Sequence, residues 1–139
     1  MGKPIISRKA WQRATNVLLW YPASKEEYAS LLEELMTKKV RTDENPEHLD
    51  PTADSAIILA EDKRLQTLAT EIEAVEFAIS GLHDGEEEII RRRFWETPKH
   101  RQHSPRQYDF LQDLPYSYSK MRRVVKRTVV TVARMLGEK

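Results

Sequence analysis

A cluster of basic and hydroxyl side chains near the C-terminus is the part of this sequence best suited to bind another molecule. Arginine can make two parallel hydrogen bonds to a guanine edge, serine can bond several bases, and lysine or arginine further along a helix meets phosphate. On a helix starting at residue 117, the early residues would face bases, and Lys126 and Arg127 would face phosphates. We therefore predict a DNA-contacting set of Ser117, Tyr118, Ser119, Lys120, Arg122, Arg123, Lys126 and Arg127.

The apolar residues around this cluster favour a helix-turn-helix over an ordinary amphipathic helix with a basic outer face. Such a motif needs a short first helix, a tight turn and a second helix presented to the major groove. We expect Phe110 and Leu111 to be the buried pair of the first helix, Leu114 to close it and Tyr116 to fill the turn. The inner stripe of the second helix would be Met121, Val124 and Val125, continued by Thr128, Val132 and Leu136.

The charge distribution supports this placement. Residues 1–88 hold 10 basic and 18 acidic residues, a balance of −8, whereas residues 89–139 hold 13 basic and 4 acidic residues, a balance of +9. A strongly basic half is the electrostatic pattern expected of a phosphate-binding region.

The elements that must position the basic cluster are all expected to be helical. Charged residues make up 32% of the chain and there are only 4 glycines, a composition that favours helices. Proline, capping and periodicity signals predict a helix over residues 7–21 that ends before Pro22, and a second helix that begins at Ser24, with Glu27 completing a capping box. Further helices are expected over 51–81, with Asp50 as its cap, and over 86–95, 104–113 and 117–136. We predict an all-α fold with a helical, coiled-coil region over 1–82, in which 38–52 form a linker or mobile loop, and a DNA-binding domain over 83–139.

The helix expected over residues 51–81 carries a heptad seam that includes Ile58, Leu65, Leu68, Ile72 and Val75. Such a seam pairs with another helix. The partner could be the preceding helix, in an antiparallel hairpin, or the same helix of another copy, in a homodimer.

The sequence gives little indication of metal binding, catalysis or a membrane span. There is no cysteine, and His100 and His103 have no paired acidic neighbours, so we expect neither a metal site nor a cofactor. Glu86, Glu87 and Glu88 are consecutive and would point in different directions on a helix, so we expect no catalytic residues. No apolar run is long enough to span a membrane, and we expect a cytoplasmic protein that is not an enzyme.

The segments EEEIIRRRFW (86–95), FLQDLPYSYSKMRRVVKR (110–127) and VARMLG (132–137) resemble small phage transcriptional regulators of the RinA and ArpU type, and the region from Ile79 to Leu136 resembles the promoter-binding region of sigma factors. The resemblance implies a late-gene activator in a bacterial host, with double-stranded DNA and the host RNA polymerase as partners. Two alternatives stay open: a small terminase subunit of a DNA-packaging machine, and an interaction protein that binds RNA polymerase or a sigma factor without binding DNA.

Overall fold

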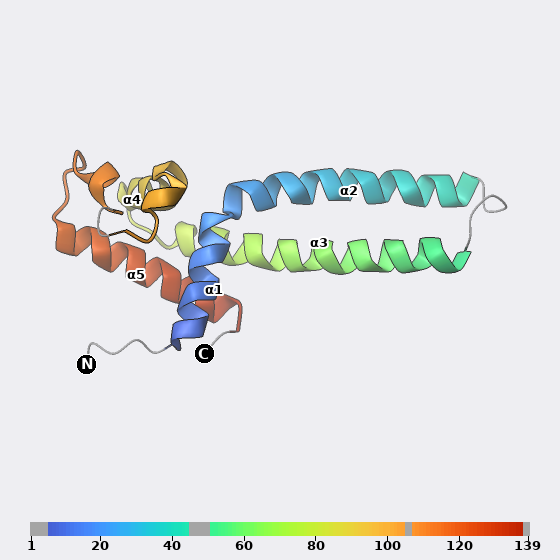
Figure 1. The fold of residues 1–139 in the computed structure, drawn as a ribbon, viewed down its shortest axis with the longest axis horizontal. Helices are drawn as coiled ribbons and strands as arrows, with labels where there is room; N and C mark the ends of the chain where they lie inside the picture. The colour runs from blue at the N-terminus through green and yellow to red at the C-terminus, as the bar shows by residue number, and fades with distance from the viewer. Residues whose placement is uncertain (1–5, 45–50, 105–106, 138–139) are drawn as a thin grey trace. The chain divides into compact units, whose positions relative to one another are not determined.

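The structure is a computed structural model that describes residues 6–44, 51–104 and 107–137, without the side chains of residues 38–44, 51–59 and 110. Every regular element in these ranges is helical, so the predicted all-α fold is confirmed (Figure 1). No helix in the described ranges is both long and apolar enough to cross a membrane. The elements are α1 (Arg8–Leu19), α2 (Tyr21–Glu44), α3 (Pro51–Ser80), α4 (Glu86–Ile90), the π-helical turn η2 (Arg91–Glu96), the 3-10 turns η3 (Lys99–Arg101) and η4 (Asp109–Leu111), and α5 (Tyr118–Met135).

The chain divides into two compact units, and the division differs from the predicted one. Residues 1–21 and 73–139 form one unit, called here the core unit, and residues 22–72 form the other, called the hairpin unit. The predicted boundary at 82/83 therefore does not coincide with the observed one. The reason is that α1 packs against α5 and η2, which brings the N-terminus into the C-terminal unit through contacts distant in sequence.

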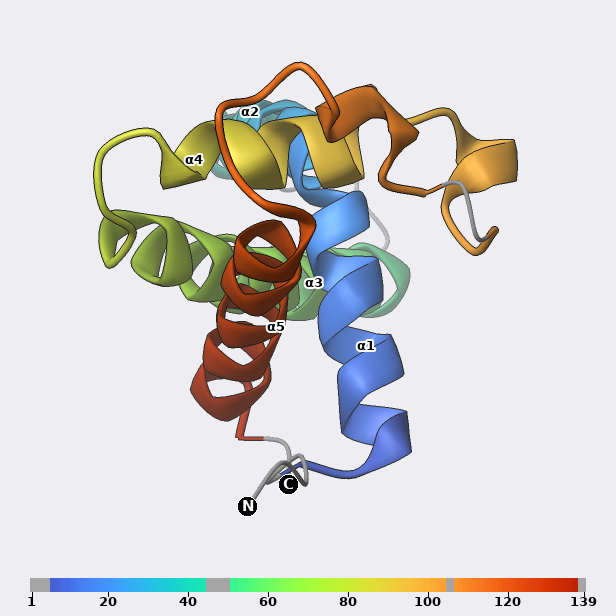
Figure 2. The same ribbon diagram turned by 90° about the vertical axis from the view of Figure 1, so that its left-hand side faces the viewer.

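The core unit is built around the contact between α1 and α5, which lie side by side in Figures 1 and 2. The small residues Ala10 and Ala14 on α1 are almost fully buried and allow the two helices to approach closely. Leu18, at the end of the same face, is fully buried, and its carbonyl oxygen accepts a 2.7 Å hydrogen bond from Trp95 Nε1. This bond ties α1 to η2.

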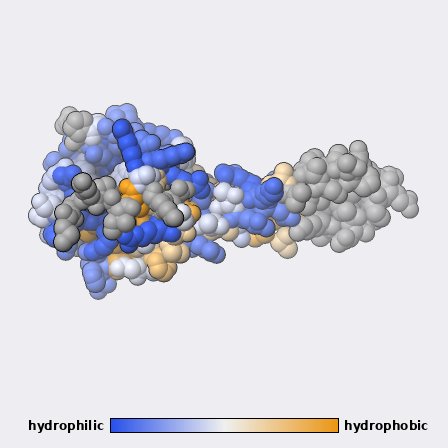
Figure 3. Space-filling model, turned by 90° about the horizontal axis from the view of Figure 1, so that it is seen from below, coloured by the Kyte–Doolittle hydropathy of each residue, from blue (hydrophilic) through white to orange (hydrophobic). Residues whose placement is uncertain are grey.

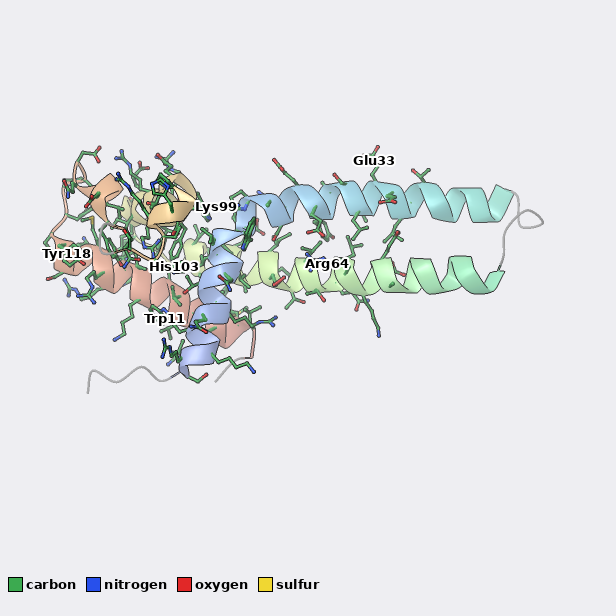
Figure 4. All side chains as sticks on the ribbon, viewed as in Figure 1. Trp11, Glu33, Arg64, Lys99, His103 and Tyr118 are labelled. Atoms are coloured by element: carbon green, nitrogen blue, oxygen red, sulfur yellow. The ribbon has the colours of Figure 1, made fainter. Side chains whose placement is uncertain are left out.

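The hairpin unit consists of the larger part of α2 and the first part of α3, which run antiparallel (Figure 1). Leu35 on α2 and Leu68 on α3 are buried, and Leu65 and Ile72 are half-buried. Arg64 points from α3 toward α2 (Figure 4) and holds Glu27 by two hydrogen bonds of 3.1 and 2.9 Å. Of the two predicted pairings of the heptad seam, the structure thus contains the one within the chain. The Ile58 side chain lies outside the described residues.

The start of α2 corrects two predictions. The break after α1 falls at Trp20, and Pro22 lies in the first turn of α2 rather than ending a helix. Proline fits there because a first-turn N–H has no helical partner to lose. Ser24 lies inside α2 and is not a cap, and Glu27 bonds Arg64 instead of forming a capping box.

The predicted linker over residues 38–52 is also wrong in part, because α2 continues to Glu44 and α3 begins at Pro51. The rest of that prediction, with the expected Asp50 cap of α3, lies outside the described residues. The helices expected over 51–81, 86–95 and 117–136 are confirmed, the second of them changing from α- to π-helical geometry at Arg91.

Candidate nucleic-acid interface

Helix α5 begins where the sequence predicts. Ser117 has an extended backbone, with φ −67° and ψ 154°, and its Oγ accepts a 3.1 Å hydrogen bond from the Lys120 backbone N–H. Serine in this position satisfies one of the N–H groups that a helix start leaves without a partner. The helix ends at Met135, and Gly137 follows with φ +77°, a conformation that glycine adopts without strain. Capping at both ends gives the basic residues between them a fixed place.

The inner face of α5 is confirmed and is wider than predicted. Met121, Val124, Val125, Thr128 and Val132 are buried as expected, and Leu136 packs at the edge of the core. Val129 and Ala133, which the prediction omitted, are also fully buried. The Thr128 hydroxyl donates a 2.8 Å hydrogen bond to the Val124 carbonyl, so this buried polar group is satisfied. The helix is therefore anchored along its whole length.

The outer face of α5 is positively charged. Arg122, Arg123 and Lys126 are exposed, and in the part of the chain that the structure describes no acidic side chain pairs with them. Ser119 is exposed beside them. These side chains are available to an anionic partner without breaking an internal ion pair.

Aromatic rings organise the first turn of α5. The Tyr118 ring is 54% exposed, meets the Tyr108 ring edge-on at 5.2 Å and lies 5.6 Å from the Arg122 guanidinium. The Lys120 ammonium lies 4.6 Å above the Tyr116 ring. Cation–π contacts of this kind restrict a long side chain while leaving its charge in solvent.

Arg127 differs from its neighbours because it already has a carboxylate partner. Its Nη2 donates a 2.6 Å hydrogen bond to Oε1 of Glu86, which is only 5% exposed. The same carboxylate oxygen accepts the His83 backbone N–H at 2.9 Å. Burial raises the pKa of the Glu86 carboxyl, but the His83 N–H and Arg127 outweigh it and hold that pKa below its usual value. Arg127 thus fastens α5 to the start of α4.

The three consecutive arginines of the RRR segment are also engaged inside the core unit. Arg91 pairs with Glu88 and Glu96, and Arg92 pairs with Glu88 and Asp113. Arg93 is buried. Many of the basic side chains after residue 88 therefore make contacts within the core unit. Near the predicted site, the basic side chains without an acidic partner among the described residues are those on the exposed face of α5.

The first helix of the predicted helix-turn-helix is not formed as expected. Within the described part of the segment 104–113, the backbone makes only the 3-10 turn η4. Leu111 is fully buried, and Leu114 and Tyr116 are half-buried, so these three occupy the interior as predicted, while the Phe110 side chain lies outside the described residues. The polar residues of this segment and Pro115 supply no apolar stripe long enough to hold a longer helix.

Sequence reasoning missed the contact that fixes the turn before α5. Gly85 has φ +88°, and a Cβ placed on it would lie 2.2 Å from the Tyr116 Oη. The Tyr116 hydroxyl thus lies directly against the glycine at the N-cap of α4. The only signal in the sequence was the pair of glycines on either side of His83 and Asp84. Those glycines predict a turn, but they do not indicate which side chain packs against it.

Comparison with protein-family models, curated proteins and solved structures finds no match for this chain.

Proposed function

We propose that the protein is a DNA-binding transcriptional regulator that uses α5 as its DNA-contacting helix. The observation that carries the proposal is the set of Arg122, Arg123 and Lys126, exposed on one face of a capped and well-packed helix without acidic partners among the described residues. A helix of 18 residues is about 27 Å long, and the major groove admits a helix of this width.

The packing of α5 supports this role because a buried inner face reduces the entropy lost when the helix binds. Rigid elements place side chains more precisely than loops do. Arg122 and Arg123 lie within the first two turns, where a recognition helix reads bases, and Lys126 lies one turn further, where phosphate contacts are common. We assign base contacts to the first two and a phosphate contact to the third.

The finer proposal, a late-gene activator of the RinA and ArpU type in a bacterial host, rests on the sequence resemblance of residues 86–95 and 110–137. In this reading the host RNA polymerase is a second partner. The short turn η4 replaces the first helix of a regular helix-turn-helix. We therefore expect η4 to fix the start of α5 and not to contact DNA.

The proposal is tested by selecting bound fragments from a digest of phage and host DNA with the full-length protein, then measuring the affinity of the enriched sequence and a scrambled one. Arg122→Gln and Arg123→Gln should each reduce the preference for the enriched sequence by about 5- to 150-fold, the effect of losing a base contact. Arg134→Gln removes the same charge from the far end of α5 and should leave the preference unchanged. The absence of any enriched sequence would contradict the regulator proposal.

A small terminase subunit is a second candidate, and the hairpin unit is the observation that favours it. Terminase small subunits join DNA-binding and coiled-coil segments and assemble into rings, and α2 and α3 form a paired-helix unit. Light scattering separates the candidates, because a ring of many copies supports packaging, whereas a dimer or monomer supports regulation.

A further inference from the structure

A cleft on the core unit has a composition that the proposed DNA contact does not explain. It has a volume of about 630 Å³ and lies between α1, η2, the segment after η3, and α5. This volume is within the range of about 300–1,000 Å³ that is usual for small-molecule sites. Figure 4 shows Trp11, His103 and Tyr118, three of its lining residues, which come from three separate segments of the core unit.

The charges of this cleft all have one sign. Arg8, Arg93 and Arg122 line it, with His103, and no aspartate or glutamate is among its lining residues. A concave site with one sign of charge concentrates the electric field and attracts ligands of opposite charge. Figure 3 shows the surface of the core unit from one side as largely hydrophilic, with smaller apolar areas between hydrophilic residues.

Arg93 makes the positive charge of the cleft unusual. It is 6% exposed, and its described hydrogen-bond partners, Gln102, Gln107 and the Tyr108 hydroxyl, carry no negative charge. Its guanidinium lies 4.7 Å from the Phe94 ring and 5.6 Å from the Tyr108 ring, and its Nε has no hydrogen-bond partner within the described residues. Burial lowers the pKa of Arg93, and Tyr108 only partly opposes this. A buried cation without a counter-charge is costly, and an anion bound in the cleft would supply that charge.

The remaining lining residues indicate a ligand with a flat ring. Trp11, Tyr108 and Tyr118 offer aromatic surfaces, and Gln12 and Asn16 on α1 offer amide groups that both donate and accept hydrogen bonds. Aromatic rings stack on nucleobases, amides can bond their edges, and arginine binds phosphate.

We propose that this cleft binds a free nucleotide, with its phosphate at Arg8 and Arg122 and its base against the aromatic side chains. Arg93, which is largely buried in the cleft wall, contributes its charge. The site goes beyond the proposed function, since nucleotide binding does not require DNA. Because Arg122 belongs to both sites, a bound nucleotide would compete with DNA, and this consequence alone rests on the proposed function.

The test titrates the ¹⁵N-labelled full-length protein with adenosine monophosphate, without DNA, and follows the three tryptophan indole N–H signals by NMR. The Trp11 signal, assigned with Trp11→Phe, should shift in a saturable manner, and calorimetry should give the dissociation constant. Arg8→Gln and Arg122→Gln should each weaken binding about tenfold or more, the effect of losing one charge-assisted hydrogen bond.

Lys9→Gln is the matched control for Arg8→Gln. Lys9 is also exposed on α1 but does not line the cleft, so its loss should change the affinity by less than about twofold. Equal weakening by Lys9→Gln and Arg8→Gln would show non-specific charge attraction and overturn the proposal.

No saturable Trp11 shift below about 10 mM nucleotide would also overturn it. A Trp11 shift with a duplex oligonucleotide but not with the mononucleotide would assign the cleft to the DNA interface and overturn it as well. Inorganic phosphate alone should bind more weakly than the nucleotide, and equal affinity would contradict the role given to the rings.

Discussion

Replacing Arg127 by Gln should destabilise the protein without changing the salt dependence of DNA binding, whereas replacing the adjacent Lys126 by Gln should do the reverse. The two residues are both basic and both on the outer side of α5, but only Arg127 is bonded to a carboxylate, that of the buried Glu86. The comparison separates a cation that holds the fold from one that is available to DNA.

The size of the stability effect follows from the unequal exposure of the pair. Removing one partner of a fully buried ion pair costs about 3–5 kcal/mol, whereas surface pairs contribute about 0–1 kcal/mol. The Glu86 side chain is 7% exposed but that of Arg127 is 52% exposed. In addition, Glu86 keeps the His83 N–H when Arg127 is lost. We therefore expect Arg127→Gln to lower the free energy of unfolding by about 1–2 kcal/mol, between these two limits.

The assay is a double-mutant cycle in urea with wild type, Arg127→Gln, Glu86→Gln and the double variant, in which the Arg127 substitution should cost less once Glu86 is neutral. In parallel, the slope of log K for DNA against log salt should fall in magnitude by about 0.9 for Lys126→Gln and remain unchanged for Arg127→Gln. Equal loss of slope in both variants, with no coupling in the cycle, would refute the reasoning.

Three further predictions concern pH and stability. The pKa of Glu86 is lower in the folded protein than its ordinary value of 4.5, so its contribution is present above that pH and is lost as the pH falls below it; the stability difference between wild type and Glu86→Gln, measured by urea unfolding, should shrink from about pH 5 to pH 3. Gly85→Ala should cost about 1–3 kcal/mol, because φ +88° is unfavourable for alanine and the new methyl group would collide with Tyr116; unchanged stability would contradict this contact. Leu68→Asp should reduce the helical circular dichroism signal, because Leu68 is buried in the hairpin unit; a variant that keeps its helicity and only loses mass in light scattering would place the seam between chains instead.

The sequence was sufficient to predict the elements whose signals are local. For α5, the Ser117 cap, the apolar stripe and the following Gly137 all lie within or beside the helix, and the structure confirms its extent. The helix of residues 51–80 was similarly evident from its periodicity, with Pro51 in its first turn. Such signals depend on 3.6-residue spacing and on capping, which need no knowledge of tertiary contacts.

The errors arose where distant residues decide the outcome. The boundary between units was misplaced because the contact of α1 with α5 joins the two ends of the chain. The ion pair of Arg127 with Glu86 was missed because the two residues lie 41 positions apart in the sequence, and the burial of Arg93 was missed because arginine is usually exposed. Pro22 was interpreted as a helix end, although a proline fits equally well in the first turn of the next helix.

The central claim, that the exposed cations of α5 bind DNA, is tested most directly by fluorescence anisotropy of a labelled duplex at several salt concentrations. The phosphate contact of Lys126 alone would give the wild-type protein a slope of log K against log salt of about −0.9, and each further phosphate contact would make the slope steeper by about the same amount. The triple variant Arg122→Gln, Arg123→Gln, Lys126→Gln should lose most of its affinity. A control triple variant Lys9→Gln, Lys63→Gln, Arg134→Gln, with the same change in net charge, should retain it. Equal loss of affinity in the two triple variants, or no binding by the wild-type protein at low salt, would contradict the account.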